Sequence, residues 1–247
     1  MPKFFIKTNQ INDNEIKIIG EDVKHIAQVL RAKIGEELIL CNVDNNTNYI
    51  TAISEIHQEY IICHIEETLN SIAESKVEVT IFQGLPKADK MEYIIQKNIE
   101  LGVKQIIPVT MSRCVVKLDE KTASKKVERW QKIAEASAKQ SGREVIPQIY
   151  MPINITDLCK KIKEYDLVLL AYENEKNVTL KDELKKLNVE NETKIGVIIG
   201  PEGGLDIKEV EMLINAGAKV ITLGNRILRT ETASIAIMSN IIYEYEM

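Results

Sequence analysis

The sequence lacks long hydrophobic stretches, and it has only four cysteines and three histidines in 247 residues. No run reaches the roughly 18 apolar residues that a membrane-spanning helix needs. The first seven residues also lack the apolar core of a secretory signal peptide. We therefore expect a cytoplasmic protein with no membrane partner.

The four cysteines, Cys41, Cys63, Cys114 and Cys159, are far apart in the chain and form no Cys-x-x-Cys pair. The histidines show no ligand spacing with them. This pattern argues against a zinc site and against a disulfide framework. We expect no metal, and we interpret the cysteines as small buried thiols.

Two nucleotide-binding fingerprints are also missing, the Gly-Lys-Ser/Thr of a P-loop and the Gly-x-Gly-x-x-Gly of a dinucleotide fold. The sequence instead has two apolar, β-branched runs, residues 195–199 and 220–223. Each run leads into a glycine-bearing loop, GPEGG at 200–204 and GNRILRTETA from Gly224. Such runs are typical of buried parallel strands, and the loops at their carboxyl ends form the ligand crevice of α/β sheets. Taken alone, GPEGG is equally compatible with a simple tight turn.

The N-terminal region, residues 1–70, is predicted to be a small β-barrel domain. A polar stretch at 69–76 marks the boundary with a second domain over 71–247. In the first domain we expect a helix over 21–32, with Val23, Ile26, Ala27 and Leu30 on one face. Short strands at the spacing of a barrel are expected at 38–41, 48–53 and 60–65.

The second domain alternates strands and helices, which is typical of a parallel sheet with helices on its faces. The expected strands are 77–82, 104–109, 165–171, 195–199 and 219–223. The expected helices are 87–101, 119–141, 179–187, 206–215 and 230–245. We interpret Trp130, in the second of these helices, as a packing residue.

Charge is unevenly distributed around a net value of −5. Residues 1–70 carry more acidic than basic side chains, whereas residues 112–143 carry more lysine and arginine. The basic segment is compatible with a phosphate-facing surface and equally with a solvated helix face. Charge alone leaves both readings open.

The pairing of IGPEGG with the later LGNRILRTETA resembles the signature of SPOUT-class RNA methyltransferases. Within that class it resembles the RsmE family, which methylates a uridine of small-subunit ribosomal RNA at ring nitrogen N3. Supporting resemblances cover most of the remaining chain. They are HIAQVLR within 24–31, KADKMEYIIQKNIELGV at 87–103, SRCV at 112–115 and the helix from Trp130 to Arg143.

This resemblance implies an α/β fold with a C-terminal SPOUT domain, in which a parallel sheet carries helices on both faces and the chain forms a deep trefoil knot. A PUA-like, RNA-binding β-barrel precedes it. The resemblance also implies S-adenosyl-L-methionine as cofactor, and 16S ribosomal RNA or the small ribosomal subunit as partner. A homodimer through the knotted domain is expected, and the apolar residues of the closing helix (Ala233, Ala236, Ile237 and Ile241) support it.

Carried over by position, the cofactor would be bound by three segments. Their residues are Leu170, Ala171, Tyr172, Gly200, Pro201, Glu202, Gly203, Leu223, Gly224, Ile227, Leu228, Arg229, Thr230 and Thr232. Of these, Thr230 is interpreted mainly as the N-cap of the closing helix.

Uracil N3 carries a proton at neutral pH, so the enzyme must remove it or stabilise the anion that forms. Arg229 is the candidate for stabilisation, because a guanidinium aimed at a uracil oxygen acts as an oxyanion clamp. Glu202 or Glu231 would accept the proton if burial raises its pKa.

Candidate RNA contacts are basic residues in both domains. They are Lys3, Arg31, Lys87, Lys90, Arg113, Lys139 and Arg143. For Arg31 an equal alternative is a cation that satisfies the carbonyls at a helix end. Two other functions remain open: a ribose 2′-O methyltransferase of the same class, and a non-catalytic RNA-binding factor in ribosome assembly.

Overall fold

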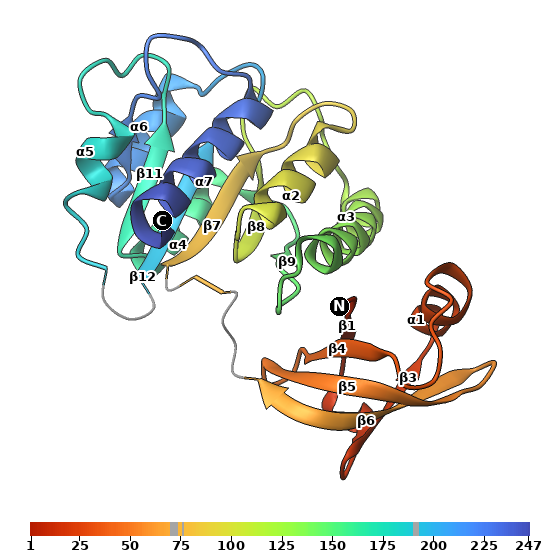
Figure 1. Cartoon of the computed structure of the whole chain (residues 1–247). Helices are drawn as coiled ribbons and strands as arrows, with labels where there is room; N and C mark the ends of the chain where they lie inside the picture. Colours follow the sequence, from red (N-terminus) through yellow and green to blue (C-terminus); the bar gives the residue numbers. More distant parts are fainter. Residues whose placement is uncertain (70–73, 76, 190–192) are drawn as a thin grey trace. The chain divides into compact units, whose positions relative to one another are not determined.

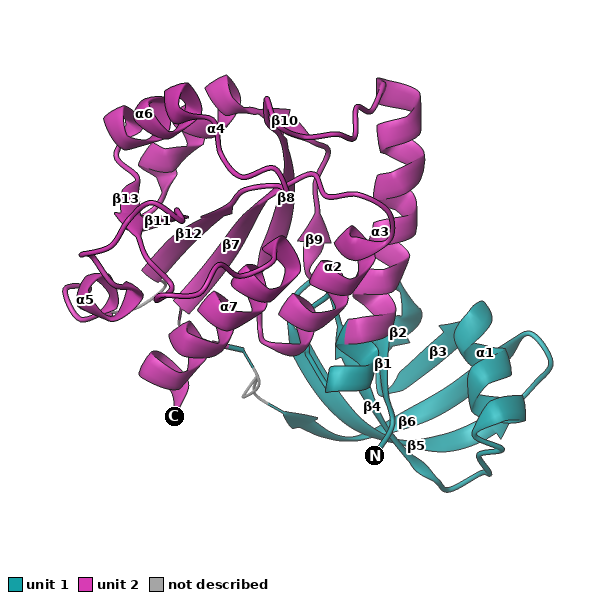
Figure 2. Ribbon diagram, turned by 90° about the horizontal axis from the view of Figure 1, so that it is seen from above, with its two compact units in different colours: residues 1–74, 138–146 teal, residues 75–137, 147–247 magenta. Residues whose placement is uncertain are grey.

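The chain folds into two compact units, which Figure 2 shows in different colours. Unit 1 comprises residues 1–74 and 138–146, and unit 2 comprises 75–137 and 147–247. The structure is a computed structural model that describes residues 1–69, 74–75, 77–189 and 193–247. The predicted domain boundary, between residues 70 and 71, lies outside the described residues. No helix in the described part of the chain is long and apolar enough to cross a membrane.

Unit 1 is built on a six-stranded sheet with the order β1-β4-β5-β6-β3-β2. β1 and β4 are parallel, and the other pairs are antiparallel. The described strands therefore form a half-barrel sheet with β1 and β2 at its edges. The elements are β1 (Lys3–Ile6), η1 (Thr8–Gln10), β2 (Ile11–Asn12), β3 (Glu15–Ile19), α1 (Glu21–Lys24), η2 (His25–Val29), β4 (Glu37–Asn42), β5 (Thr47–Ile56) and β6 (Tyr60–Leu69).

The core of unit 1 follows from alternation along its strands. In β3 the exposed and buried positions alternate, which places Ile16 and Ile18 inside with Phe4 and Leu40. Period-two patterning of this kind is what a sheet with one covered face requires. The three strands predicted for this region are confirmed as β4, β5 and β6, each longer than expected.

The predicted helix over 21–32 is wrong in its second half. After the single turn of α1 the chain forms a π-helical turn, η2, in which Leu30 N–H donates to His25 O at 2.9 Å. A π turn is wider than an α turn, so Leu30 leaves the expected buried face and is 41% exposed. Arg31 lies beyond the helix in the left-handed region, with φ 55°.

Unit 2 is organised around a parallel sheet with the order β10-β8-β7-β12-β11-β13, with β9 paired to β8 (Figure 1). Its strands are β7 (Val77–Gly84), β8 (Gln105–Thr110), β9 (Gln148–Ile149), β10 (Ile153–Asn154), β11 (Leu167–Ala171), β12 (Thr193–Ile199) and β13 (Lys219–Ile221). Its helices are α2 (Lys90–Glu100), α3 (Glu120–Ser141), α4 (Ile155–Lys161), η3 (Ile162–Glu164), α5 (Leu180–Leu184), α6 (Ile207–Ala216) and α7 (Thr230–Glu246). The end of α3 belongs to unit 1.

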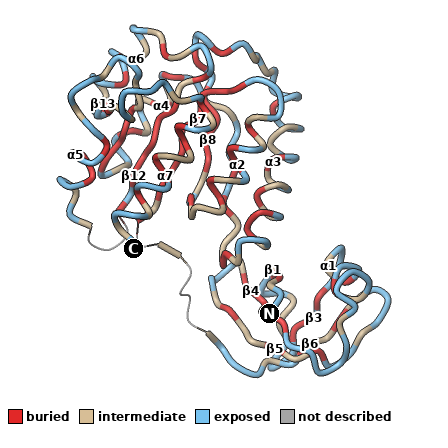
Figure 3. Tube along the Cα trace, turned by 45° about the horizontal axis from the view of Figure 1, so that its top comes forward, coloured by how far each residue is buried: buried red, intermediate tan, exposed pale blue. Residues whose placement is uncertain are grey.

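Helices cover both faces of this sheet, as Figure 2 shows for α4 and α6 on one side and α2 and α7 on the other. The central strand β12 is accordingly without polar side chains from Ile195 onward, with Ile195, Val197 and Ile198 fully buried (Figure 3). This confirms the predicted α/β class and the reading of the 195–199 run as a buried parallel strand. Trp130 is 3% exposed, which confirms its packing role.

Helix α4 was not predicted, because its seven residues are too few to show a clear helical period. Its local signal is the N-cap, where the Asn154 side chain accepts a hydrogen bond from Asp157 N–H at 2.9 Å. Helix α7 gives a second correction. Ala233, Ile237 and Ile241 are buried within unit 2, so they do not form the free apolar face that supported a dimer.

Three of the four cysteines are buried, as expected. Burial raises the pKa of both Cys41 and Cys63 to about 11, which makes these thiols unreactive. Among the residues that the structure describes, no cluster of three or more histidine, cysteine, aspartate or glutamate side chains is placed to hold a metal ion.

Candidate functional site

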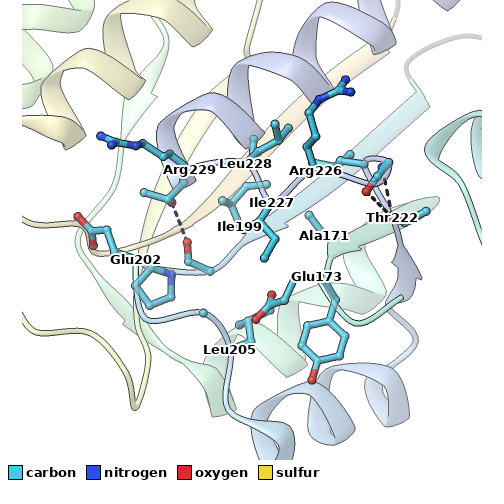
Figure 4. A pocket seen from close by; sticks show the side chains of 18 of the residues that line it. Ala171, Glu173, Ile199, Glu202, Leu205, Thr222, Arg226, Ile227, Leu228 and Arg229 are labelled. Carbon is cyan, nitrogen blue, oxygen red and sulfur yellow. Dashed lines mark hydrogen bonds between the residues drawn. The ribbon is translucent and has the colours of Figure 1, made fainter. Parts of the chain in front are cut away.

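The carboxyl ends of three neighbouring strands, β11, β12 and β13, open into a cavity of about 480 Å³ (Figure 4). This volume is within the range of small-molecule sites. The cavity is lined by Lys90, Ala171, Tyr172, Glu173, Lys176, Ile199, Gly200, Pro201, Glu202, Gly203, Gly204, Leu205, Thr222, Leu223, Gly224, Asn225, Arg226, Ile227, Leu228, Arg229, Thr230 and Ala233. Both glycine loops thus meet at one site, as the sequence predicts.

A buried hydrogen-bond relay joins the two loops. Thr230 Oγ1 donates to the Gly200 carbonyl at 2.7 Å, and Gln83 Nε2 donates to Thr230 Oγ1 at 2.8 Å. Gln83 is fully buried at the end of β7, and Thr230 is 7% exposed. Because buried polar groups are costly to leave unpaired, the relay fixes the spacing of the two walls of the cavity.

Close backbone approach at this site requires glycine at two positions. A Cβ on Gly84, at the end of β7, would lie 2.7 Å from Pro201 N and 2.8 Å from Pro201 Cδ. Gly204 has φ +71°, a conformation that side chains rarely adopt. The first loop can therefore pass directly over the end of β7.

One edge of the cavity carries a cation between two carboxylates. Lys90 Nζ lies 3.2 Å from Glu202 Oε1 and 3.3 Å from Glu231 Oε2. Glu202 Oε1 also accepts a hydrogen bond from Lys87 N–H at 3.0 Å. These ion pairs and this hydrogen bond connect the start of α2 to the first glycine loop and to the first turn of α7.

This arrangement sets the protonation of Glu202. Partial burial alone would raise the pKa of Glu202, but hydrogen bonds from its own N–H, from Lys87 N–H and from the Lys90 ammonium outweigh it, so the pKa lies below its usual range. Partial burial would likewise lower the pKa of Lys90, but the two carboxylates outweigh it and raise the pKa. The condition under which Glu202 would accept the proton, a pKa raised by burial, is therefore not met.

Arg229 lies beside this edge as the residue that precedes α7. It is the N-cap of that helix, with an extended backbone of φ −66° and ψ 153°, and its side chain is exposed. Figure 4 shows Arg229 and Glu202 on the same side of the cavity. Thr230, expected to be the N-cap, is instead the first helical residue, and its hydroxyl donates to the Gly200 carbonyl.

The comparisons with known proteins agree with this geometry. An RNA methyltransferase domain matches residues 73–242, and an RNA methyltransferase PUA domain matches residues 18–66. Ribosomal RNA small subunit methyltransferase E of Bacillus subtilis is 35% identical over 252 residues, covering 100% of this chain and 98% of the relative. The protein of the same name from Mesomycoplasma hyopneumoniae is 32% identical, covering 98% and 99%.

The chain belongs to the ribosomal RNA small subunit methyltransferase E family.

A crystal structure of a member of this family from Neisseria gonorrhoeae, bound to S-adenosyl methionine, superposes on this chain with a TM-score of 0.86. It is 28% identical, and the match covers 99% of this chain and 98% of that one. The resemblance inferred from the two glycine loops is thus confirmed, as is the order of a PUA domain followed by an RNA methyltransferase domain.

Most residues predicted to bind the cofactor line the cavity, and two do not. Leu170 is fully buried in β11, one position before the lining begins at Ala171. Thr232 is exposed on α7, outside the cavity. The lining residues absent from the prediction are Lys90 (assigned there to RNA), Glu173, Lys176, Ile199, Gly204, Leu205, Thr222, Asn225, Arg226 and Ala233. Most of these residues directly flank predicted positions in the sequence, and this adjacency could have identified them.

Three basic residues predicted to contact RNA instead bind other groups of unit 1. Arg143 is only 5% exposed, and its Nε donates to Glu74 Oε1 at 3.2 Å. Lys139 Nζ pairs with Asp22 at 2.8 Å, and Lys3 Nζ donates to a backbone carbonyl in the turn after α3 at 2.7 Å. Burial and pairing give Arg143 a packing role in place of the predicted phosphate contact.

The other predicted RNA contacts are more accessible. Arg31 and Lys87 are exposed, whereas Lys90 belongs to the cavity edge described above. Arg113 is half-exposed, with Nη1 donating to the Gly203 carbonyl at 3.3 Å and Nη2 3.8 Å from Asp206. Arg113 thus supports the outside of the first glycine loop.

Proposed function

We propose that this chain transfers the methyl group of S-adenosyl-L-methionine to N3 of a uridine in 16S ribosomal RNA of the small ribosomal subunit. The observation that carries the proposal is the cavity between the two glycine loops. Membership in the small subunit methyltransferase E family and the Neisseria relative with bound S-adenosyl methionine support it.

The cavity fits this cofactor in size and in chemistry. Apolar side chains of Ile199, Leu205, Ile227 and Leu228 provide surfaces for an adenine ring and a thioether chain. The glycine loops expose backbone N–H and C=O groups that can bind the edges of adenine. When bound, S-adenosyl-L-methionine supplies an electrophilic methyl group on a sulfonium.

The edge formed by Lys90, Glu202, Glu231 and Arg229 is the proposed acceptor side. Arg229, exposed and beside the cavity, stabilises the negative charge that uracil develops as N3 loses its proton. Glu202 is a weak base because its pKa is lowered, so anion stabilisation by Arg229 carries more of the activation. Glu231 is the second candidate to accept the proton, directly or through water.

Uracil N3 lies on the Watson–Crick edge, so the target uridine must be unpaired or turned out of its helix before reaction. Arg31, Lys87 and Arg113 are the proposed contacts to the RNA backbone.

Two further features rest on the family resemblance, a trefoil knot formed by the glycine loops and a homodimer through unit 2. Sedimentation of the active protein at the mass of a monomer would contradict the dimer.

Nucleoside analysis by mass spectrometry tests the proposed activity. Ribosomal RNA from cells that lack this chain should lose 3-methyluridine, and the loss should be restored by the wild-type gene but not by Arg229→Ala. Loss of a 2′-O-methyl nucleoside would identify a ribose methyltransferase instead. No loss of any modified nucleoside would favour a non-catalytic assembly factor.

A further inference from the structure

The residue after Tyr172, Glu173, extends from the end of β11 into the cavity. Figure 4 shows its carboxylate turned across the cavity toward Leu205 and the first glycine loop. The position is confirmed by the neighbouring Gly204, on which a Cβ would lie 2.7 Å from Glu173 Oε1. The absence of a side chain at 204 thus leaves the space that this carboxylate occupies.

Two carboxylates line the cavity, and they differ in their partners. Glu202 is engaged by Lys90 and by Lys87 N–H. Within the described residues, the Glu173 carboxylate has no hydrogen bond or ion pair. Lys176 Nζ lies nearby but donates to the Glu173 backbone carbonyl at 2.9 Å. The cavity therefore presents to a ligand one carboxylate that makes no direct ion pair with a described side chain.

An unpaired carboxylate beside apolar walls favours a cationic ligand. Its attraction to a cation is stronger where part of the surrounding water is displaced, and charge-assisted hydrogen bonds are about twice as strong as neutral ones. S-adenosyl-L-methionine has two positive groups, the sulfonium and the α-ammonium of its methionine part, which outnumber the single negative α-carboxylate. The adenosine part is uncharged.

We propose that Glu173 binds the positively charged methionine part of S-adenosyl-L-methionine and thereby selects the cationic donor over neutral adenosine compounds. The inference rests on the proposed function and assigns a new ligand contact within the same cavity. It also gives Gly204 a specific role, since a side chain there would displace the carboxylate.

Calorimetric titration of the purified full chain with three ligands tests this assignment. S-adenosyl-L-methionine carries both cations, S-adenosylhomocysteine carries only the ammonium, and methylthioadenosine carries neither. Glu173→Gln keeps the size of the side chain and removes its charge. This variant should lower the affinity for S-adenosyl-L-methionine by at least about tenfold and change the affinity for methylthioadenosine by no more than about twofold. Glu211→Gln, an exposed site on α6 outside the cavity, makes the same charge change and should alter neither.

The third ligand identifies which cation is bound. If Glu173→Gln lowers the affinity for S-adenosylhomocysteine as much as that for S-adenosyl-L-methionine, Glu173 binds the ammonium. If the affinity for S-adenosylhomocysteine is unchanged, Glu173 binds the sulfonium. Unchanged affinity of Glu173→Gln for S-adenosyl-L-methionine, or equal weakening of methylthioadenosine, would overturn the inference. Glu173→Asp, which withdraws the carboxylate by one methylene, should give an intermediate loss. If the wild-type chain binds none of the three ligands, the proposed function fails instead.

Discussion

Lys90 Nζ lies 3.2 Å from Glu202 Oε1 and so joins the start of α2 to the first glycine loop. The same nitrogen lies 3.3 Å from Glu231 Oε2, and Glu202 lies on the side of the cavity on which Arg229 lies. Partly exposed ion pairs of this kind add little to stability. Their importance is positional, because they hold two negative groups close together beside the proposed acceptor site.

Replacing Lys90 by Met should reduce methyl transfer by about tenfold or more, since even a small misplacement of catalytic groups is costly. The free energy of unfolding should fall by less than about 1 kcal/mol. Turnover and denaturant unfolding measure the two effects. The control is Lys97→Met, which breaks an ion pair with Glu100 on the same helix, outside the cavity, and should retain activity. Equal activity of the two variants would remove Lys90 from the site.

The lowered pKa of Glu202 predicts a pH dependence of stability. The pKa in the folded chain is below the ordinary value of 4.5, so the ionised form stabilises the fold above that pH. This contribution is lost as pH falls through the folded pKa. Unfolding measured between about pH 6 and pH 3 should therefore show a steeper loss for the wild type than for Glu202→Gln. Parallel curves would show that Glu202 is not held as a carboxylate.

Arg229→Ala should keep the affinity for S-adenosyl-L-methionine within a few-fold while abolishing transfer, because the guanidinium acts on the acceptor. Arg229→Lys restores the charge but not the planar fork, and it should recover only a small part of the rate. Calorimetry and single-turnover kinetics separate binding from chemistry. Full turnover by the alanine variant would exclude Arg229 from the mechanism.

Thr230→Val removes the hydroxyl that joins Gln83 to Gly200 and leaves two buried groups without that partner. We expect a loss of about 1–3 kcal/mol in the free energy of unfolding, with weaker binding of S-adenosyl-L-methionine. The matched control, Thr232→Val, lies two residues later on the exposed face of α7 and should change stability by less than about 0.5 kcal/mol. Similar losses in both variants would contradict the relay.

The sequence predicted the architecture of unit 2 and the place of the cavity because both depend on local patterns. Apolar runs such as 195–199 identify buried strands, and glycine loops mark their carboxyl ends. The pairing of GPEGG with the loop from Gly224 then identified the family. Each of these signals is contained in a short stretch of sequence, and the structure confirms that both loops line one cavity.

What the sequence could not show depends on contacts between distant segments. Arg143 is like any exposed arginine in the sequence, and only the fold shows that it pairs with Glu74. The bridge from Lys90 to Glu202 and Glu231 joins three elements, so no local pattern predicts it. The π turn that exposes Leu30 replaces an ordinary helical period without a local marker.

Transfer of labelled methyl groups to small-subunit ribosomal RNA in vitro is the most direct test of the central claim. Purified chain, S-adenosyl-L-methionine with a labelled methyl group and unmodified small subunits would be combined, and the RNA digested to nucleosides. We predict that the label appears in 3-methyluridine. Label in a 2′-O-methyl nucleoside, or no label in RNA although the chain binds the donor, would contradict the account.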